Sequence, residues 1–140
     1  DAEVTGRCHC TPMGGYEAHL EKLAERVRDP HPTRVVWQPG VPWKRQFYWL
    51  WWDHPSTAAI VEADVDREKG EVRVTCSVNP SGLHVLLGPE LVDMKEEVAV
   101  FLNDQEVFRG IPQPSLAALL STGVRGDPDL CFEARVPLAR

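Results

Sequence analysis

The densest group of residues able to do chemistry lies near the start of the chain, where Cys8, His9 and Cys10 are followed by His19. Thiolates and imidazoles bind zinc and other soft metals, so the residue types suit a metal or redox site. The spacing of these residues does not suit such a site. Structural zinc sites combine two closely spaced pairs of ligands, and no second pair lies nearby. We expect no metal and no cofactor, and interpret this stretch as a loose segment cut from a parent domain, with a soft-metal or redox role as the alternative.

Three acidic residues, Glu62, Asp64 and Asp66, recur at every second position of a strand-like run. Paired carboxylates can serve glycoside hydrolysis, and closely spaced carboxylates can hold calcium. A solvated strand face with a charged edge explains the same pattern more simply, and that is what we expect.

Aromatic residues concentrate in the stretch QFYWLWWDHP, residues 46–55. Read as one strand, its alternation places Phe47, Trp49 and Trp51 on the inward face. The remaining candidates for a surface that stacks on sugar rings are Trp43, Tyr48 and Trp52. Packing between two layers is the simpler interpretation, because aromatic side chains dominate core energetics and large exposed apolar patches are rare.

The other two cysteines, Cys76 and Cys131, each lie inside an apolar run that is typical of a strand. A disulfide between them and a pair of buried free thiols fit the sequence about equally well. The cysteine content therefore leaves the redox compartment open.

A mainly β fold must position all of these residues. One amphipathic helix is predicted over residues 16–28, where a single apolar stripe is formed by Tyr16, Leu20, Leu23, Ala24 and Val27. From residue 33 onward, apolar residues recur with a period of two in short runs separated by turn residues. This pattern is typical of an antiparallel, immunoglobulin-like β-sandwich of about seven or eight strands.

Local signals refine that fold. Asn103 and Asp104 tolerate a left-handed backbone and predict the turn of a β-hairpin within residues 97–110. Pro114 near a first turn and Gly123 past the last predict a short helix over Pro114–Thr122. We expect the helix at 16–28 to cover the outer face of the aromatic strand.

The overall charge limits the partners. The chain has 140 residues and a net charge of −6, with no cluster of Lys and Arg. This balance argues against nucleic acid and against an anionic membrane as partners, and no apolar run has the length of a membrane span. One domain, or a small domain carrying an N-terminal appendage, is expected at this length, and the missing initiator Met predicts a processed product or a piece of a longer protein.

Several spaced motifs resemble a group of large bacterial proteins with the α/β-hydrolase fold: esterases, phospholipase/carboxylesterases and prolyl-oligopeptidase-like peptidases. The helix is followed by RDPHP, TRVVW and RQFYWL. In that group the last catalytic-domain helix is followed by an R-N-P-x-P-x-x-V-x-W segment and a F/Y-Y-W-L strand. The run LVDMKEEVAVFLNDQEVFRG and the helix SLAALL are similar to the hairpin and helix of the group's immunoglobulin-like tail. The similarity extends from about Gly6 to the C-terminus.

The resemblance implies little catalysis in this chain. Such hydrolases carry Ser, Asp and His in that order, with the serine in a G-x-S-x-G elbow, and no serine here lies in that pattern. His9, in RCHCTPM, occupies the place of the group's triad histidine, although Cys8 replaces a glycine and the spacing to Met13 is longer. A base without its nucleophile performs no acyl transfer, so we expect the isolated chain to be inert.

We therefore divide the chain into residues 1–32, a remnant of a catalytic domain, and residues 33–140, the β-sandwich. The leading hypothesis is a non-catalytic accessory domain of an α/β-hydrolase-like esterase or peptidase, which packs against its parent catalytic domain or another protein surface, or positions substrate. The alternative is a carbohydrate-binding module that uses Trp43, Tyr48 and Trp52. A hydrolase fragment retaining His9 is a weaker alternative. A secreted or periplasmic bacterial location agrees with these hypotheses, but no sequence signal assigns it.

Overall fold

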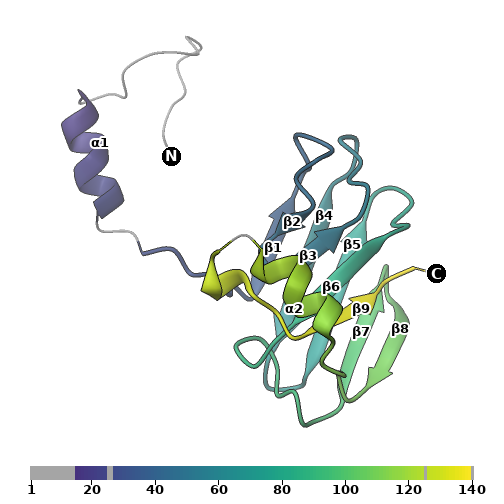
Figure 1. The fold of residues 1–140 in the computed structure, drawn as a ribbon. Helices are drawn as coiled ribbons and strands as arrows, with labels where there is room; N and C mark the ends of the chain where they lie inside the picture. The colour runs from purple at the N-terminus through teal and green to yellow at the C-terminus, as the bar shows by residue number, and fades with distance from the viewer. Residues whose placement is uncertain (1–14, 25–26, 125, 140) are drawn as a thin grey trace.

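Two packed β-sheets form the body of the protein (Figure 1). The computed structural model describes residues 15–24, 27–124 and 126–139. Its strands are β1 (Arg34–Trp37), β2 (Gln46–Phe47), β3 (Leu50–Trp52), β4 (Val61–Asp66), β5 (Glu71–Cys76), β6 (Leu83–Leu87), β7 (Val98–Leu102), β8 (Gln105–Gly110) and β9 (Ala134–Pro137). The helices are α1 (Gly15–Ala24), α2 (Leu116–Gly123) and the 3-10 turn η1 (Pro128–Leu130). The mainly β, two-layered architecture expected from the period-two pattern is confirmed.

The core lies between a five-stranded sheet, ordered β1-β4-β5-β7-β8, and a four-stranded sheet, ordered β2-β3-β6-β9. Every second residue of β4 and of β5 is buried, because side chains of a strand alternate between the two faces of its sheet. Aromatic rings join the layers: Trp37 of β1 stacks on Phe47 at 5.8 Å and meets Trp52 edge-on at 6.2 Å. The aromatic stretch therefore serves mainly to hold the two sheets together.

The aromatic stretch is a hairpin, so its prediction as one strand was wrong. Tyr48 has a left-handed backbone (φ 51°), and the chain reverses there so that β2 pairs with β3. The register opposes Phe47 to Leu50, and Gln46 to Trp51. Trp52 consequently faces inward, whereas Trp51, which was predicted inward, faces outward beside His84 of β6.

The five-stranded sheet is mixed, which corrects the expectation of a purely antiparallel sandwich. β5 and β7 run parallel, with Glu71 opposite Ala99 and Val74 opposite Leu102. The chain between them contributes β6 to the other sheet, so this connection crosses from one layer to the other and back. The remaining strand pairs are antiparallel.

Both local predictions are confirmed. Asn103 (φ 47°) and Asp104 (φ 65°) form the turn between β7 and β8, and the Asn103 side chain accepts a hydrogen bond from the backbone of Cys76 at 3.0 Å. The short helix α2 begins after Ser115, whose hydroxyl caps it by accepting a bond from the Ala118 amide. It spans Leu116–Gly123, so it begins two residues later and ends one residue later than predicted.

The first helix does not cover the sheet, contrary to expectation. α1 is described over Gly15–Ala24, and its apolar residues Tyr16, Leu20 and Leu23 are exposed. In Figure 1 α1 stands away from the sheets, and α2 and η1 lie over the four-stranded sheet instead. The Gln46 side chain of β2 donates a hydrogen bond to the Leu130 carbonyl of η1. The surface that we expected the first helix to cover is thus already occupied by η1. None of the described helices is long and apolar enough to cross a membrane.

Candidate functional site

The predicted aromatic binding residues are not presented together. Trp52 is 1% exposed and donates its indole N–H to the Ser81 carbonyl at 2.8 Å, so it cannot stack on a surface ligand. Tyr48 is half-buried and packs edge-on against Phe47 at 5.0 Å. Trp43 lies in a loop and is 76% exposed, and it alone of the three offers a ring face to solvent. Assigning Trp52 to a binding surface was wrong because the hairpin reverses the alternation of the stretch.

The predicted cysteine and histidine group falls where the structure gives no description. Cys8, His9 and Cys10 lie outside the described residues, and so does the side chain of His19. Among the residues that are described, no group of three or more His, Cys, Asp or Glu side chains is placed to hold a metal ion.

The three carboxylates of β4 are a solvated strand face, as expected. Arg34 of β1 lies across from them and pairs with Glu62 at 2.9 Å and Asp64 at 3.3 Å. Asp66 pairs with Lys69 in the following turn at 2.6 Å. Each carboxylate thus has a basic partner at the surface, and nothing in this arrangement requires a ligand.

Cys76 and Cys131 are both free thiols, so the disulfide alternative was wrong. Cys76 is buried in the core, and burial raises the pKa of its thiol. Cys131 is exposed, which differs from the expectation that both thiols would be buried.

A polar group that the sequence did not reveal lies on the outer face of the four-stranded sheet. We call it the Asp53 cluster; it consists of Trp51, Asp53, His84 and Arg135. The Asp53 carboxylate accepts from the Trp51 indole and from Arg135, each at 2.8 Å, and lies 3.2 Å from His84 Nε2. Arg135 also lies over the Trp51 ring, 5.3 Å from its centre. Neighbouring strands β3, β6 and β9 bring these side chains together.

The surroundings of the Asp53 cluster shift the pKa values of Asp53 and His84. Burial by itself raises the pKa of Asp53, but hydrogen bonds from Trp51, Arg135 and His84, with the charge of Arg135, lower it to about 2. Burial also lowers the pKa of His84, and the Arg135 charge lowers it further, while Asp53 partly offsets both effects. The cluster therefore holds an ionised carboxylate beside a histidine that resists protonation.

This geometry supports a structural role for the cluster. A histidine held by a carboxylate is two-thirds of a hydrolytic triad, in which the second ring nitrogen must activate a nucleophile. The second ring nitrogen of His84, Nδ1, is buried and has no hydrogen-bond partner within the described part of the chain. His84 is therefore not poised to activate a serine or a cysteine.

The His84 side chain should make stability depend on pH. Since its pKa is lowered on folding from the ordinary value of 6.5, the unfolded chain takes up this proton at higher pH than the folded protein does. Stability from this group is complete above pH 6.5 and is lost as the pH falls below it. Urea unfolding midpoints at pH 7.5 and 5.5 should differ less in His84→Gln than in wild type. Equal pH dependence in both proteins would assign the effect to other groups.

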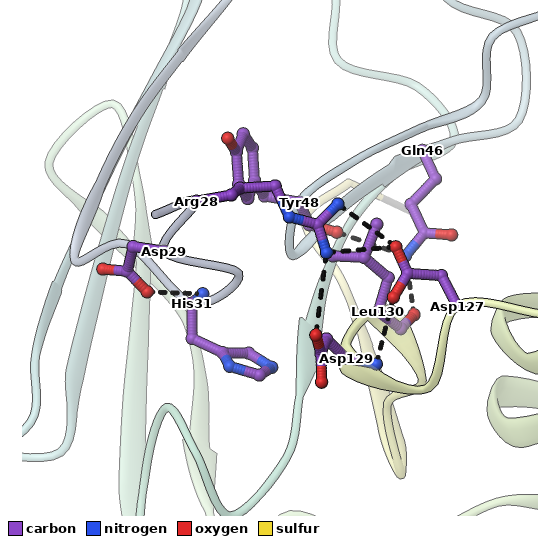
Figure 2. Close-up of polar contacts among 8 residues, drawn as sticks. All are labelled: Arg28, Asp29, His31, Gln46, Tyr48, Asp127, Asp129 and Leu130. Carbon is purple, nitrogen blue, oxygen red and sulfur yellow. Dashed lines mark hydrogen bonds and ion pairs between the residues drawn. The ribbon is translucent and has the colours of Figure 1, made fainter. Parts of the chain in front are cut away.

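A second cluster fixes the segment that enters the sandwich. Arg28 donates two hydrogen bonds to the Asp127 carboxylate, each at 3.1 Å, and lies 3.8 Å from Asp129 (Figure 2). Asp127 and Asp129 flank Pro128, the first residue of η1. The Arg28–Asp127 pair therefore joins chain segments that lie 99 residues apart.

Two further contacts extend this attachment toward β1. The Pro32 carbonyl accepts from the indole of the buried Trp49 at 2.8 Å, and the His31 carbonyl accepts from Arg67 at 2.6 Å. The His31 ring also meets Phe132 edge-on at 5.9 Å. We call the contacts of residues 28–32 with the sandwich the linker clamp.

An open cleft of ≈ 430 Å³ lies beside the linker clamp. It is bounded by the 30–31 segment, the 88–90 turn and the chain that leaves η1, and its lining includes His31, Glu90, Asp129, Cys131 and Glu133. Its acidic lining matches the net negative charge of the chain.

Comparisons with protein-family models, with curated proteins and with solved structures found no match to this chain.

Proposed function

We propose that this chain is a non-catalytic accessory domain that holds a preceding structural unit in a fixed orientation. The linker clamp is the observation that carries the proposal. Units joined by a linker move relative to each other by default, unless contacts at the junction prevent it. Here Arg28, His31 and Pro32 are each bonded to a different part of the sandwich.

The motifs of the sequence suggest which unit the domain would serve. RDPHP, which contains the linker clamp, and RQFYWL resemble the junction between catalytic domain and immunoglobulin-like tail in α/β-hydrolase-like esterases and peptidases. We infer that the sandwich is such a tail and that its partner is a hydrolase domain of that class. The Asp53 cluster, which lacks an activated nucleophile, agrees with a role without catalysis.

Limited proteolysis tests the linker clamp directly. Replacing Arg28 by alanine removes its ion pairs with Asp127 and Asp129, and surface ion pairs of this kind contribute up to about 1 kcal/mol. Proteinase K should then cut the 27–33 segment about threefold faster than in wild type. The matched control is Arg73→Ala, which removes an equally exposed arginine paired with Glu71 and should leave cleavage of this segment unchanged. Equal cleavage rates in Arg28→Ala and wild type would contradict the orienting role.

Two assays separate this function from the alternatives. Hydrolysis of p-nitrophenyl acetate by the isolated chain should not exceed the buffer rate, and turnover abolished by His9→Ala would instead indicate a hydrolase. Tryptophan fluorescence should stay constant during titration with soluble polysaccharides. A saturable change that disappears in Trp43→Ala would favour the carbohydrate-binding alternative.

A further inference from the structure

The Arg135 side chain crosses one strand of the four-stranded sheet to reach Asp53. Arg135 belongs to β9 and Asp53 follows β3, and β6 lies between these two strands in the sheet. The guanidinium donates to the Asp53 carboxylate at 2.8 Å and lies over the Trp51 ring, 5.3 Å from its centre. We call this connection from β9 to Asp53 the Arg135 strap.

His84 belongs to β6, the strand that the Arg135 strap crosses. Its neighbours in the sheet are Trp51 of β3 on one side and Pro137 of β9 on the other. Only 15% of the His84 side chain is exposed. In the described part of the chain, the charged groups that act on its ring are Asp53 and Arg135, the two ends of the strap.

The hydrogen bonds of this group suit a neutral imidazole. The ionised Asp53 carboxylate can only accept, so the ring proton belongs on Nε2 of His84, 3.2 Å away. The other ring nitrogen, Nδ1, then holds a lone pair, and it is buried without a partner among the described residues. With the ring neutral, the single negative charge of Asp53 balances the single positive charge of Arg135.

Protonation of the ring would disturb this arrangement in two ways. Nδ1 of His84 would become a buried N–H donor without an acceptor, which costs free energy. The imidazolium would also be a second positive charge beside Arg135, while Asp53 supplies one negative charge for both. Movement of the guanidinium into solvent relieves the repulsion and lets water reach Nδ1, and the imidazolium keeps its bond to Asp53.

We propose that the Arg135 strap is an acid-sensitive switch, in which protonation of His84 releases Arg135 from Asp53 and uncovers the Trp51 ring. Trp51 is 9% exposed with Arg135 over it, so release adds an indole face to the surface of the sheet. The switch acts below pH 6.5, because burial and the Arg135 charge lower the pKa of His84 from that value. It goes beyond the proposed function and does not depend on the linker clamp.

Hydrogen exchange of the Arg135 Nε–H, followed by NMR, tests the switch in the full chain. This N–H is buried, and in wild type its protection should fall by up to about tenfold per pH unit below 6.5, because release is linked to uptake of one proton. The His84 ring resonances should shift over the same pH range, a comparison that needs no variant. Amides of β5 should stay at least about tenfold better protected than the Arg135 Nε–H, since the sandwich remains folded.

Two variants assign the effect to one histidine. His84→Gln keeps an N–H donor for Asp53 but takes up no proton, so Arg135 protection should not change with pH. The matched control is His54→Gln, which removes an exposed histidine next to Asp53 in the sequence and should behave as wild type.

Four results would overturn the switch. In wild type, these are equal Arg135 protection at pH 7.5 and 5.5, a loss of protection at a pH where the His84 ring does not titrate, and a loss shared to the same level by the β5 amides. The fourth is a fall in His84→Gln that equals the fall in wild type.

Discussion

Replacement of Trp52 by alanine should lower the free energy of unfolding by about 3–5 kcal/mol, the usual cost of removing a buried indole. The side chain is 1% exposed, packs edge-on against Trp37 and bonds the Ser81 carbonyl, so its loss leaves a cavity between the sheets and an unpaired carbonyl. Single domains are commonly stable by about 5–15 kcal/mol, so this variant should be close to unfolding. Urea titration followed by far-UV circular dichroism measures the change.

Trp43→Ala is the control, because it removes the same side chain from a position that is 76% exposed. Its free energy of unfolding should change by less than about 0.5 kcal/mol. Similar losses in both variants would contradict the placement of Trp52 between the layers and would reopen the interpretation of the stretch as a single strand.

Asp53→Ala should cost about 2–3 kcal/mol, the second largest effect that we expect. The carboxylate is the shared acceptor for Trp51, Arg135 and His84, and its removal leaves the largely buried Trp51 indole and the partly buried imidazole without their partner. The carboxylate is itself 39% exposed, so solvent screening keeps the loss below that of a fully buried ion pair.

Two variants identify the cause of that loss. Asp53→Asn keeps an acceptor for Trp51 and should retain about half of the stability that alanine removes. Asp64→Ala removes a carboxylate that pairs with Arg34 at the surface and should cost less than about 1 kcal/mol. If Asp53→Ala is no more costly than Asp64→Ala, the Asp53 cluster is not a unit that stabilises the sheet.

The layered β architecture could be predicted because it depends on local alternation. In β4 and β5 every second residue is apolar and buried in the core, and this alternation can be read directly from the sequence. The Asn103–Asp104 turn was likewise recognisable, since both residue types accept a left-handed backbone. The reversal at Tyr48 was not, because neither Tyr48 nor Trp49 is a usual turn residue and the apolar run continues through them.

The Asp53 cluster and the linker clamp could not be predicted for a different reason. Asp53 lies 31 residues from His84 and 82 from Arg135, and Arg28 lies 99 residues from Asp127. Which charged residues meet depends on strand order, including the placement of β6 in the opposite sheet from β5 and β7. Periodicity shows which side of a strand faces outward, but it does not identify the neighbouring strand.

The parallel pairing of β5 with β7 has a consequence for how the protein reaches its native state. Because β6 lies between them in the chain and belongs to the other sheet, β5 and β7 can pair only by closing a loop that contains a whole strand. Assembly should be a single cooperative event on the millisecond-to-second scale that is typical of chains dominated by long-range pairing.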